Sequence, residues 1–414
     1  MILANISVPL LGFVDTAVVG HLAHPGFLAG TALGSLLVTV MFWLLGFLRM
    51  STTGLVAQAS DDEGQQAYVI GQGLLWSCLL AVLILTFQSS LFSGLLLLVD
   101  QSNLDTALVS AEQYFSIRVW IAPLALMNIV FAGFYIGRGL TKFVLYGVLL
   151  SNSINLVLDI LFVPVWGLGV SGVAYATVAA EVGLFVYYGL GISRFLNIKQ
   201  CVARFSFMPD LQMVKLNTSL FFRSFLLQLC ISFLTIYATR FGEVSVAINA
   251  ILMQFFLFIS FSLDGVAFAL ESLVGKAKGR NNINKLRLYI RTGVIMASGF
   301  AVFYIVFYWL LNAQIVALLT DLEQIKSQMD DYVIWIILFP LVSYISFVMD
   351  GIFVGLAWSR QMLTSMFIAA CVFFMVFMLS KGLLNHGLWL AFSCFMFARG
   401  ISQTYILVRQ YQRL

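Results

Sequence analysis

Long apolar runs separated by short polar links extend along the whole chain. Most runs reach about 20 residues or more, the length that an α-helix needs to cross a bilayer. Several runs are longer than this, so their helices must tilt or extend beyond the hydrocarbon core. We therefore predict an all-α integral membrane protein with twelve transmembrane helices, at residues 1–22, 28–57, 67–98, 108–137, 142–164, 170–193, 213–239, 245–275, 287–312, 328–357, 361–381 and 385–408.

Composition supports this fold class. Of the 414 residues, 61% are hydrophobic and 10% are charged, whereas soluble domains carry about 25% charged residues. The first apolar run is full length and lacks a small-residue cleavage pattern, so we expect no cleavable signal peptide. It also starts at residue 1 without a basic flank, which is compatible with a preceding segment in the native chain. The five cysteines form no CxxC pair and the three histidines form no HExxH motif, so we expect no cofactor and no dedicated metal centre.

Basic residues are distributed unevenly between the two sets of links. Of the 22 Lys and Arg residues, three (Arg240, Lys326 and Lys381) fall in one set of links, and four lie within or near the ends of predicted helices. The other fifteen fall in the second set of links or at the C-terminus. Because cytoplasmic links carry the excess of Lys and Arg in membrane proteins, we predict that both termini are cytoplasmic.

The chain also contains an internal repeat. Segments 120–142 and 337–359 align without gaps. A shift of one position gives an offset of 218 residues, which is named the repeat offset, and brings two pairs of glycines into register. The same offset places LAGTAL (28–33) on VAINAI (246–251). Two halves of six helices each point the same way across the membrane, an arrangement found in transporters with a site between the halves. We therefore predict two lobes related by pseudo-two-fold symmetry, with an amino-terminal lobe at 1–196, a cytoplasmic linker at 197–212 and a carboxy-terminal lobe at 213–414.

The first predicted helix holds a proline and an acid. Pro9 removes one helix hydrogen bond and clashes with the preceding turn, which predicts a bend. Asp15 follows six residues later, and an ionised carboxylate in hydrocarbon costs about 2.5 to 3.5 kcal/mol on insertion scales. A structural Asp bonded to a neighbouring helix is the alternative, but intramembrane acids are functional by default. We therefore predict that this helix is a moving part with a protonatable group.

A second polar group lies in the fifth and sixth predicted helices. Asn152, Asn155 and Asp159 share one face of the fifth helix, and Thr177 and Glu181 are one turn apart in the sixth. A stripe facing lipid would lack partners, so we expect it to face the bundle interior. If the first-helix acid faces this stripe, desolvation and like charge favour the protonated form of one carboxyl. The same oxygens also suit sodium, by analogy with oxygen-ligated cations, so H⁺ and Na⁺ both remain open.

The remaining intramembrane acids lie in the second half of the chain. Glu271 precedes a basic run by about one turn, which favours a structural ion pair near the inner interface. Asp264 and Asp350 leave structural pairing and a functional role open. Arg118 and Arg223 are candidates for neutralising such acids, because buried arginines more often pair than bind substrate.

Five motifs carry a family resemblance. FVDTAVVGHL, FLAGTALG and LRMSTTGLVAQA follow one another in the first two helices, and NLVLDI and GVSGVAYATVAAE occur in the fifth and sixth. They resemble the MATE family of multidrug and toxic-compound extrusion transporters, and MSTTG and SLDGVAFALES resemble its DinF branch. The resemblance spans nearly the whole chain. It implies two six-helix lobes around a V-shaped central cavity, and export of organic cations and other amphipathic drugs against a flow of H⁺ or Na⁺.

Carried over position by position, the resemblance assigns residue roles. Asp15 matches the first-helix acid whose protonation is thought to bend that helix at its proline and release drug. Asn155 and Asp159 match the N-x-x-x-D pair of the fifth helix, and Thr177 matches the sixth-helix hydroxyl of the amino-lobe cation site. Asn128 matches a polar residue of the fourth helix in the same network.

The chain departs from some of these relatives in the carboxy lobe. Their seventh helix carries a coupling Glu, whereas RSFLLQLCISFLTIYATR here contains no acid. Asp350 is not cleanly in register with their tenth-helix acid. Both departures favour ion coupling in the amino lobe.

These features predict a secondary active multidrug efflux antiporter of the bacterial inner membrane, not an enzyme. It would exchange organic cations and amphipathic drugs for H⁺, with Na⁺ as the alternative ion. A lipid or lipid-linked precursor flippase of a related fold is the alternative function, but its cavity should be basic, and here six intramembrane acids outnumber four arginines.

We expect drugs or organic cations and membrane lipid as partners, no nucleic acid, and a monomer. The predicted ion-coupling residues, which are also the candidate sodium ligands, are Asp15, Asn155, Asp159 and Thr177. The residues predicted for the substrate cavity and its polar network are Asn128, Asn152, Glu181 and Pro9.

Overall fold

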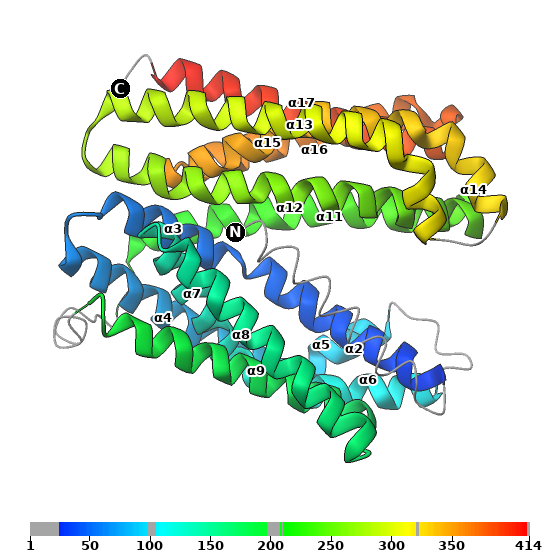
Figure 1. The fold of residues 1–414 in the computed structure, drawn as a ribbon, viewed down its shortest axis with the longest axis horizontal. Coiled ribbons are helices and arrows are strands. Elements are labelled where there is room, and N and C mark those ends of the chain that lie inside the picture. Colours follow the sequence, from blue (N-terminus) through cyan, green and yellow to red (C-terminus); the bar gives the residue numbers. More distant parts are fainter. Residues whose placement is uncertain (1–24, 98–104, 197–207, 209, 320–322, 412–414) are drawn as a thin grey trace. The chain divides into compact units, whose positions relative to one another are not determined.

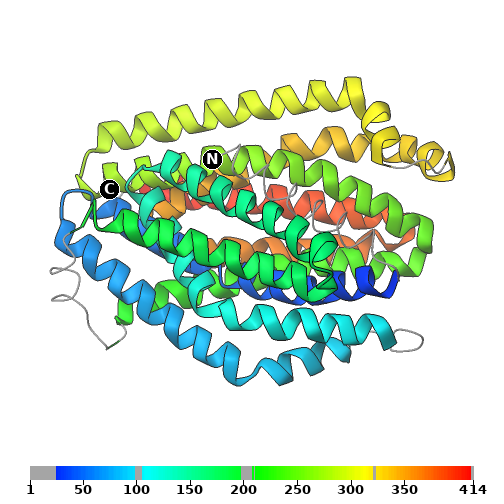
Figure 2. The same cartoon turned by 60° about the horizontal axis from the view of Figure 1, so that its bottom comes forward.

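The computed structural model describes residues 25–97, 105–196, 208, 210–319 and 323–411, and the regular structure in these residues is entirely helical. The chain divides into two compact units, one reaching to Val214 and the other beginning at Lys215. They are named the amino unit and the carboxy unit, and both consist of helices (Figures 1 and 2). The first predicted helix, with Pro9 and Asp15, lies outside the described residues, as does most of the predicted linker.

The described helices follow one another with short links. Those of the amino unit are α2 (Pro25–Leu44), α3 (Phe47–Gln58), α4 (Glu63–Thr86), α5 (Gln88–Leu96), α6 (Asp105–Arg118), the 3₁₀ turn η1 (Val119–Ile121), α7 (Ala122–Gly137), α8 (Thr141–Ile160), the π-helical turn η2 (Leu161–Val165) and α9 (Gly169–Ile192). Then come α11 (Leu211–Ala238), η3 (Thr239–Phe241), α12 (Glu243–Gly279), α13 (Ile283–Leu319), α14 (Glu323–Met329), η4 (Asp330–Tyr332), α15 (Val333–Leu356), α16 (Ser359–Leu379), η5 (Lys381–Leu383) and α17 (Asn385–Tyr411).

Ten helical spans within the described residues are long and apolar enough to cross a membrane. They correspond to the second to eleventh predicted helices. The twelfth predicted helix is α17, which is 27 residues long but more polar. The described part of the chain therefore agrees with the predicted all-α membrane fold.

Three predicted helices are more irregular than their apolar runs suggested. The second is interrupted between α2 and α3, where Gly46 has a low helix propensity. The fourth contains η1 just before Pro123, which has no N–H to donate and is best tolerated in the first turn of a helix. The fifth ends in η2, where Pro164 lies in the turn and the Trp166 N–H donates to the Leu161 oxygen, five residues back, at 3.0 Å.

The internal repeat is visible in the helices themselves. α2, α6 and α8 begin one repeat offset before α12, α14 and α16, respectively. Tight helix contacts recur at the same offset. A Cβ atom on Gly133 would lie 2.7 Å from the Arg49 oxygen, and one on the equivalent Gly351 would lie 2.5 Å from the Ala267 oxygen. Because only glycine allows backbones to approach this closely, each unit joins one pair of helices, α3 with α7 and α12 with α15, in the same way.

Candidate functional site

The polar stripe of the fifth predicted helix lies on α8. Asn155 and Asp159 are one turn apart and both side chains are completely buried, whereas Asn152 is only partly buried. This burial agrees with a stripe that faces the interior. An acid and an amide at zero exposure in an otherwise apolar helix are costly to bury, so their environment must stabilise them.

Polar groups of α9 meet this stripe. The Asn155 side-chain amide donates to the Thr177 hydroxyl oxygen at 3.3 Å, and that hydroxyl donates to the Val173 carbonyl oxygen at 2.9 Å. Thr177 therefore already uses its proton within α9 and presents only oxygen lone pairs to α8. The two predicted coupling residues, Asn155 and Thr177, are in direct contact.

A second link joins α7 to α9 one turn further along. The amide of Asn128 donates to a carboxylate oxygen of Glu181 at 2.7 Å and to its backbone oxygen at 3.0 Å. Glu181 lies one turn beyond Thr177 on α9, so α9 carries two adjacent polar links, one to α8 and one to α7, which together are named the amino-unit network. Asn128, which the sequence assigned only by resemblance, is 4% exposed and belongs to it.

The network contains more acceptors than donors. The amide oxygens of Asn128 and Asn155 are buried and accept no hydrogen bond within the described part of the chain. Together with the Asp159 and Glu181 carboxyl groups they form an oxygen-rich interior. Such a group of oxygens can take up a proton or hold a hard cation. The described residues contain no cluster of three or more His, Cys, Asp and Glu side chains suited to a metal ion.

Asp350, the tenth-helix acid, has a different environment. On α15 its carboxylate accepts hydrogen bonds from Arg223 of α11 and Arg399 of α17, both through the same oxygen. The Gln403 amide donates to the other oxygen at 2.7 Å. Arg223 and Arg399 are 6% and 3% exposed at their side chains. The prediction that Arg223 pairs with an acid is confirmed, and Asp350 forms ion pairs with two arginines.

Sequence reasoning missed Arg399 and Gln403 as partners of this acid. Their i, i+4 spacing on one face of α17 was the available signal. Arg118, the other arginine predicted to pair, is buried, and its Nε and Nη1 atoms have no acceptor among the residues described.

Aromatic side chains fill the carboxy unit where the amino unit is polar. The residues that follow Asn155, Asp159 and Thr177 at the repeat offset are Phe373, Phe377 and Phe395, all at most 2% exposed. The rings of Phe373 and Phe395 lie edge to face with centroids 6.2 Å apart. A ring contact thus replaces the hydrogen bond between Asn155 and Thr177.

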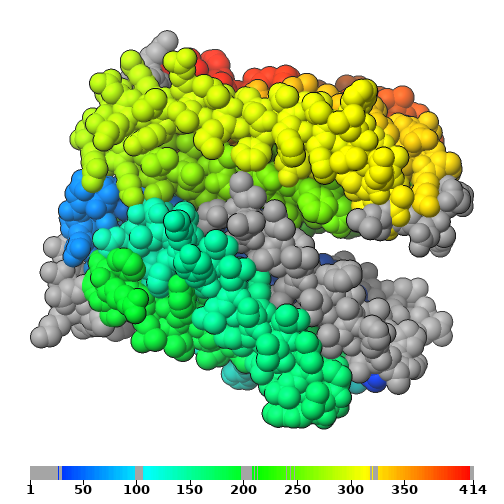
Figure 3. All heavy atoms as spheres, viewed as in Figure 1, coloured from blue at the N-terminus to red at the C-terminus, as the bar shows by residue number. Residues whose placement is uncertain are grey.

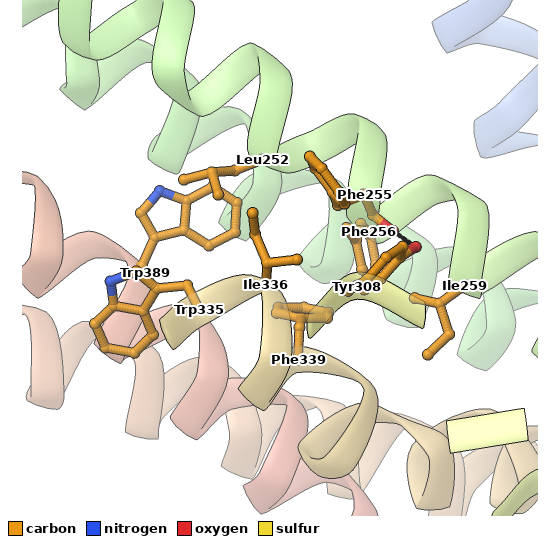
Figure 4. A pocket seen from close by; sticks show the side chains of 9 residues that line it. All are labelled: Leu252, Phe255, Phe256, Ile259, Tyr308, Trp335, Ile336, Phe339 and Trp389. Atoms are coloured by element: carbon orange, nitrogen blue, oxygen red, sulfur yellow. Dashed lines mark hydrogen bonds between the residues drawn. The ribbon is translucent and has the colours of Figure 1, made fainter. Parts of the chain in front are cut away.

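The carboxy unit also contains a small apolar cavity of about 10 Å³ (Figure 4). Its polar neighbours are already bonded: the Tyr308 hydroxyl donates to the Phe255 oxygen, and the Trp389 indole donates to Asn249, both at 2.7 Å. A water molecule needs about this much space and two to four polar partners. The cavity is therefore a packing gap rather than a substrate site. It is lined by Leu252, Phe255, Phe256, Ile259, Tyr308, Trp335, Ile336, Phe339 and Trp389.

Comparisons with known proteins agree with this architecture. The sequence profile of the MatE family matches residues 1–161 and 220–379. DNA damage-inducible protein F of Escherichia coli (strain K12) is 35% identical over 421 residues, covering 100% of this chain and 91% of its own length. A probable multidrug resistance protein NorM of Bacillus subtilis (strain 168) is 24% identical, covering 83% of this chain and 77% of its own. The fold matches a crystal structure of MATE in the bent conformation with a TM-score of 0.85 at 21% identity, covering 99% of this chain and 93% of that one.

Proposed function

Because the chain belongs to the MatE family, whose members are membrane transporters and not enzymes, we propose that it is a secondary active antiporter that exports drugs in exchange for protons. The cargo would be organic cations and amphipathic drugs, since several relatives are named as probable multidrug resistance proteins. The bacterial inner membrane is the proposed location, with both termini in the cytoplasm.

The observation that carries this proposal is the buried acid of α8 and its neighbours. Asp159 is completely buried beside Asn155, whose amide contacts Thr177. A carboxyl group buried on the same helix face as an amide that contacts a hydroxyl oxygen is a place where a proton or a cation could be held. The acid of α15 in the carboxy unit differs, because Asp350 is bound by two guanidinium groups. This difference supports ion coupling in the amino unit alone.

The internal repeat supports adding Asp15 to the site. The residue that follows Asp15 at the repeat offset is Phe233, and its ring centroid lies 5.0 Å from that of Phe377 and 5.8 Å from that of Phe373. These two rings correspond to Asp159 and Asn155. If the repeat extends to the first helix, Asp15 would face Asp159, and only one of the two carboxyl groups would readily be ionised at a time.

The mechanism then couples one proton site to one bendable helix. Uptake of a proton from outside would neutralise the pair formed by Asp15 and Asp159. The first helix would bend at Pro9, since a proline cannot complete the helix hydrogen bonds there, and substrate binding in the amino unit would weaken. Release of the proton to the cytoplasm would restore the starting state and complete alternating access.

Ethidium efflux from vesicles containing the purified protein tests this proposal. A pH gradient and a sodium gradient are imposed separately on the wild type, Asp15→Asn, Asp159→Asn and a matched control, Glu112→Gln, which changes an exposed acid of α6. Proton-driven efflux that is lost in both Asn variants but kept in the control is expected. Elution as a single folded species separates lost transport from lost structure.

Two other outcomes would change the proposal. Efflux driven by sodium alone would make Asp15, Asn155, Asp159 and Thr177 a sodium site. Full proton-driven activity in both Asn variants would refute the coupling site, and no ethidium movement under either gradient would favour a lipid or lipid-linked precursor flippase.

A further inference from the structure

The turn between α12 and α13 is built rigidly from backbone and asparagine contacts. Asn281 has a left-handed backbone (φ 51°), and the Asn282 N–H donates to the Ala277 oxygen at 2.9 Å, which ends α12. The Asn282 side-chain oxygen then accepts from the Lys285 N–H at 3.0 Å and caps the start of α13. These contacts fix the backbone of the turn from which the basic side chains extend.

A cavity of about 280 Å³ lies at this turn. It is lined by three polar residues, Lys278, Asn281 and Asn282, and by the apolar residues Ala277, Ile283 and Leu286. The cavity thus offers one cation and two amide groups next to an apolar wall. This combination suits the boundary between a charged headgroup and its acyl chains.

Positive charge is concentrated in the stretch of chain around this turn. Residues 272–320 contain six basic side chains and no Asp or Glu. Lys285 and Arg291 are exposed and Lys278 is partly exposed, and none of these three forms an ion pair with another described residue. The six basic residues are Lys276, Lys278, Arg280, Lys285, Arg287 and Arg291.

An uncovered apolar face of α13 continues from this basic turn. It begins at Leu288 and reaches Leu310, both 58% exposed, a distance of about 33 Å at 1.5 Å per residue, which matches the hydrocarbon thickness of a bilayer. α13 runs along an outer edge of the carboxy unit in Figure 2, and its side chains form an open surface of that unit in Figure 3. Its other exposed apolar residues are Ile295, Met296, Val302, Phe303, Val306 and Trp309.

The equivalent turn of the amino unit has the opposite charge. Between α3 and α4 the chain reads Asp61-Asp62-Glu63, and the repeat offset places Asp62 on Arg280. Both turns join equivalent helices, and both carry a side-chain cap, since Asp62 accepts from the Gln65 N–H at 2.9 Å. The basic character is therefore a property of one turn and not of the scaffold.

We propose that the α12–α13 turn binds the phosphate of an anionic phospholipid whose acyl chains lie along the exposed face of α13. The phosphate would contact Lys278 and the asparagine amides, with Lys285 and Arg291 around it. A phospholipid would pair with the positive charge, place its headgroup in the cavity and cover the apolar face of α13. Free phosphate would pair with the charge and enter the cavity but would leave the apolar face uncovered. The site is separate from the amino-unit network and does not depend on the transported cargo.

Lipid binding to the delipidated full-length protein in a neutral detergent tests this proposal. Phosphatidylglycerol or phosphatidylcholine is added, and the bound lipid is counted by native mass spectrometry. The test variant is Lys278→Gln/Lys285→Gln/Arg291→Gln. The matched control, Lys142→Gln/Arg360→Gln/Arg409→Gln, removes three other exposed basic residues and so the same total charge.

The wild type and the control should prefer phosphatidylglycerol by about tenfold or more, and the test variant should lose this preference while binding phosphatidylcholine equally well. Equal loss in both triple variants would mean diffuse attraction and would overturn the site, as would an unchanged preference in the test variant.

Inorganic phosphate is added in a separate arm. If it raises the thermal unfolding midpoint as much as phosphatidylglycerol does, the ligand is free phosphate and the lipid assignment is wrong. Single Lys278→Gln and Lys285→Gln variants retain the test if the triple variant does not fold.

Discussion

The two units share one helical scaffold but differ in what fills it. Helix starts and glycine contacts recur at the repeat offset. Asn155 and Thr177 nevertheless meet through a hydrogen bond, whereas Phe373 and Phe395 meet through their rings. The two units therefore keep the same backbone packing at these positions while the chemistry of their interior side chains differs.

Charge differs between the units in the same way. Glu181 of α9 corresponds to Arg399 of α17 at the repeat offset. Glu181 accepts a hydrogen bond from a neutral amide, whereas Arg399 binds a carboxylate. The negative charge of Asp350 is therefore compensated by two cations within its unit, whereas the hydrogen-bond donor that meets Glu181 is uncharged. Under the proposed function, the amino unit is the titrating unit, which exchanges protons, and the carboxy unit, whose acid is ion-paired, is the fixed one.

Asp350→Asn should have the largest effect on the fold. It removes the carboxylate that binds the buried side chains of Arg223 and Arg399, and breaking a buried pair by removing one partner costs about 3–5 kcal/mol. Chemical or thermal unfolding in detergent measures the loss. Asp159→Asn is the comparison variant, since neutralising that acid should change stability much less than it changes transport. Equal destabilisation by the two variants would contradict the distinction between a fixed and a titrating unit.

Gly133→Ala and Gly351→Ala should each destabilise by a smaller and similar amount. The new methyl group meets a backbone oxygen in both units, and such overpacking costs about 1–3 kcal/mol. Gly189→Ala and Gly299→Ala are matched controls, because nothing lies within 4 Å of either added Cβ atom, and both should gain up to about 1 kcal/mol of helix propensity. A large difference between the Gly133 and Gly351 variants would mean that the two scaffolds are not equivalent.

Thr177→Val should have the smallest effect on stability. It removes the oxygen that accepts from Asn155, and a net hydrogen bond contributes about 0.5–1.5 kcal/mol. Transport should nevertheless need a steeper ion gradient for its half-maximal rate, since a lone pair of the proposed coupling site is lost. Phe395→Leu changes the equivalent position of the carboxy unit and should leave the ion dependence as it is. An unaltered ion dependence in Thr177→Val would remove this residue from the coupling site.

Sequence reasoning reached much of the candidate site because membrane burial makes polar residues conspicuous. Asn155, Asp159 and Thr177 stand out in apolar helices, and helical spacing alone placed two of them on one face. It could not show that Asn128 bonds to Glu181, since 53 residues separate them and only the packing of α7 on α9 brings them together. For the same reason it left Asp350 open, because its partners lie on α11 and α17.

By itself, the sequence determined the membrane class, the positions of the helices and the internal repeat, since apolar length and periodicity are local properties that follow directly from residue order. Only the tertiary structure decided that Asp350 lies between two guanidinium groups and that Asn128 donates a hydrogen bond to Glu181. It also decided that matching positions of the repeat carry polar contacts in one unit and ring contacts in the other. These outcomes depend on which helices pack against each other. The sequence of one apolar helix does not specify which other helices it packs against.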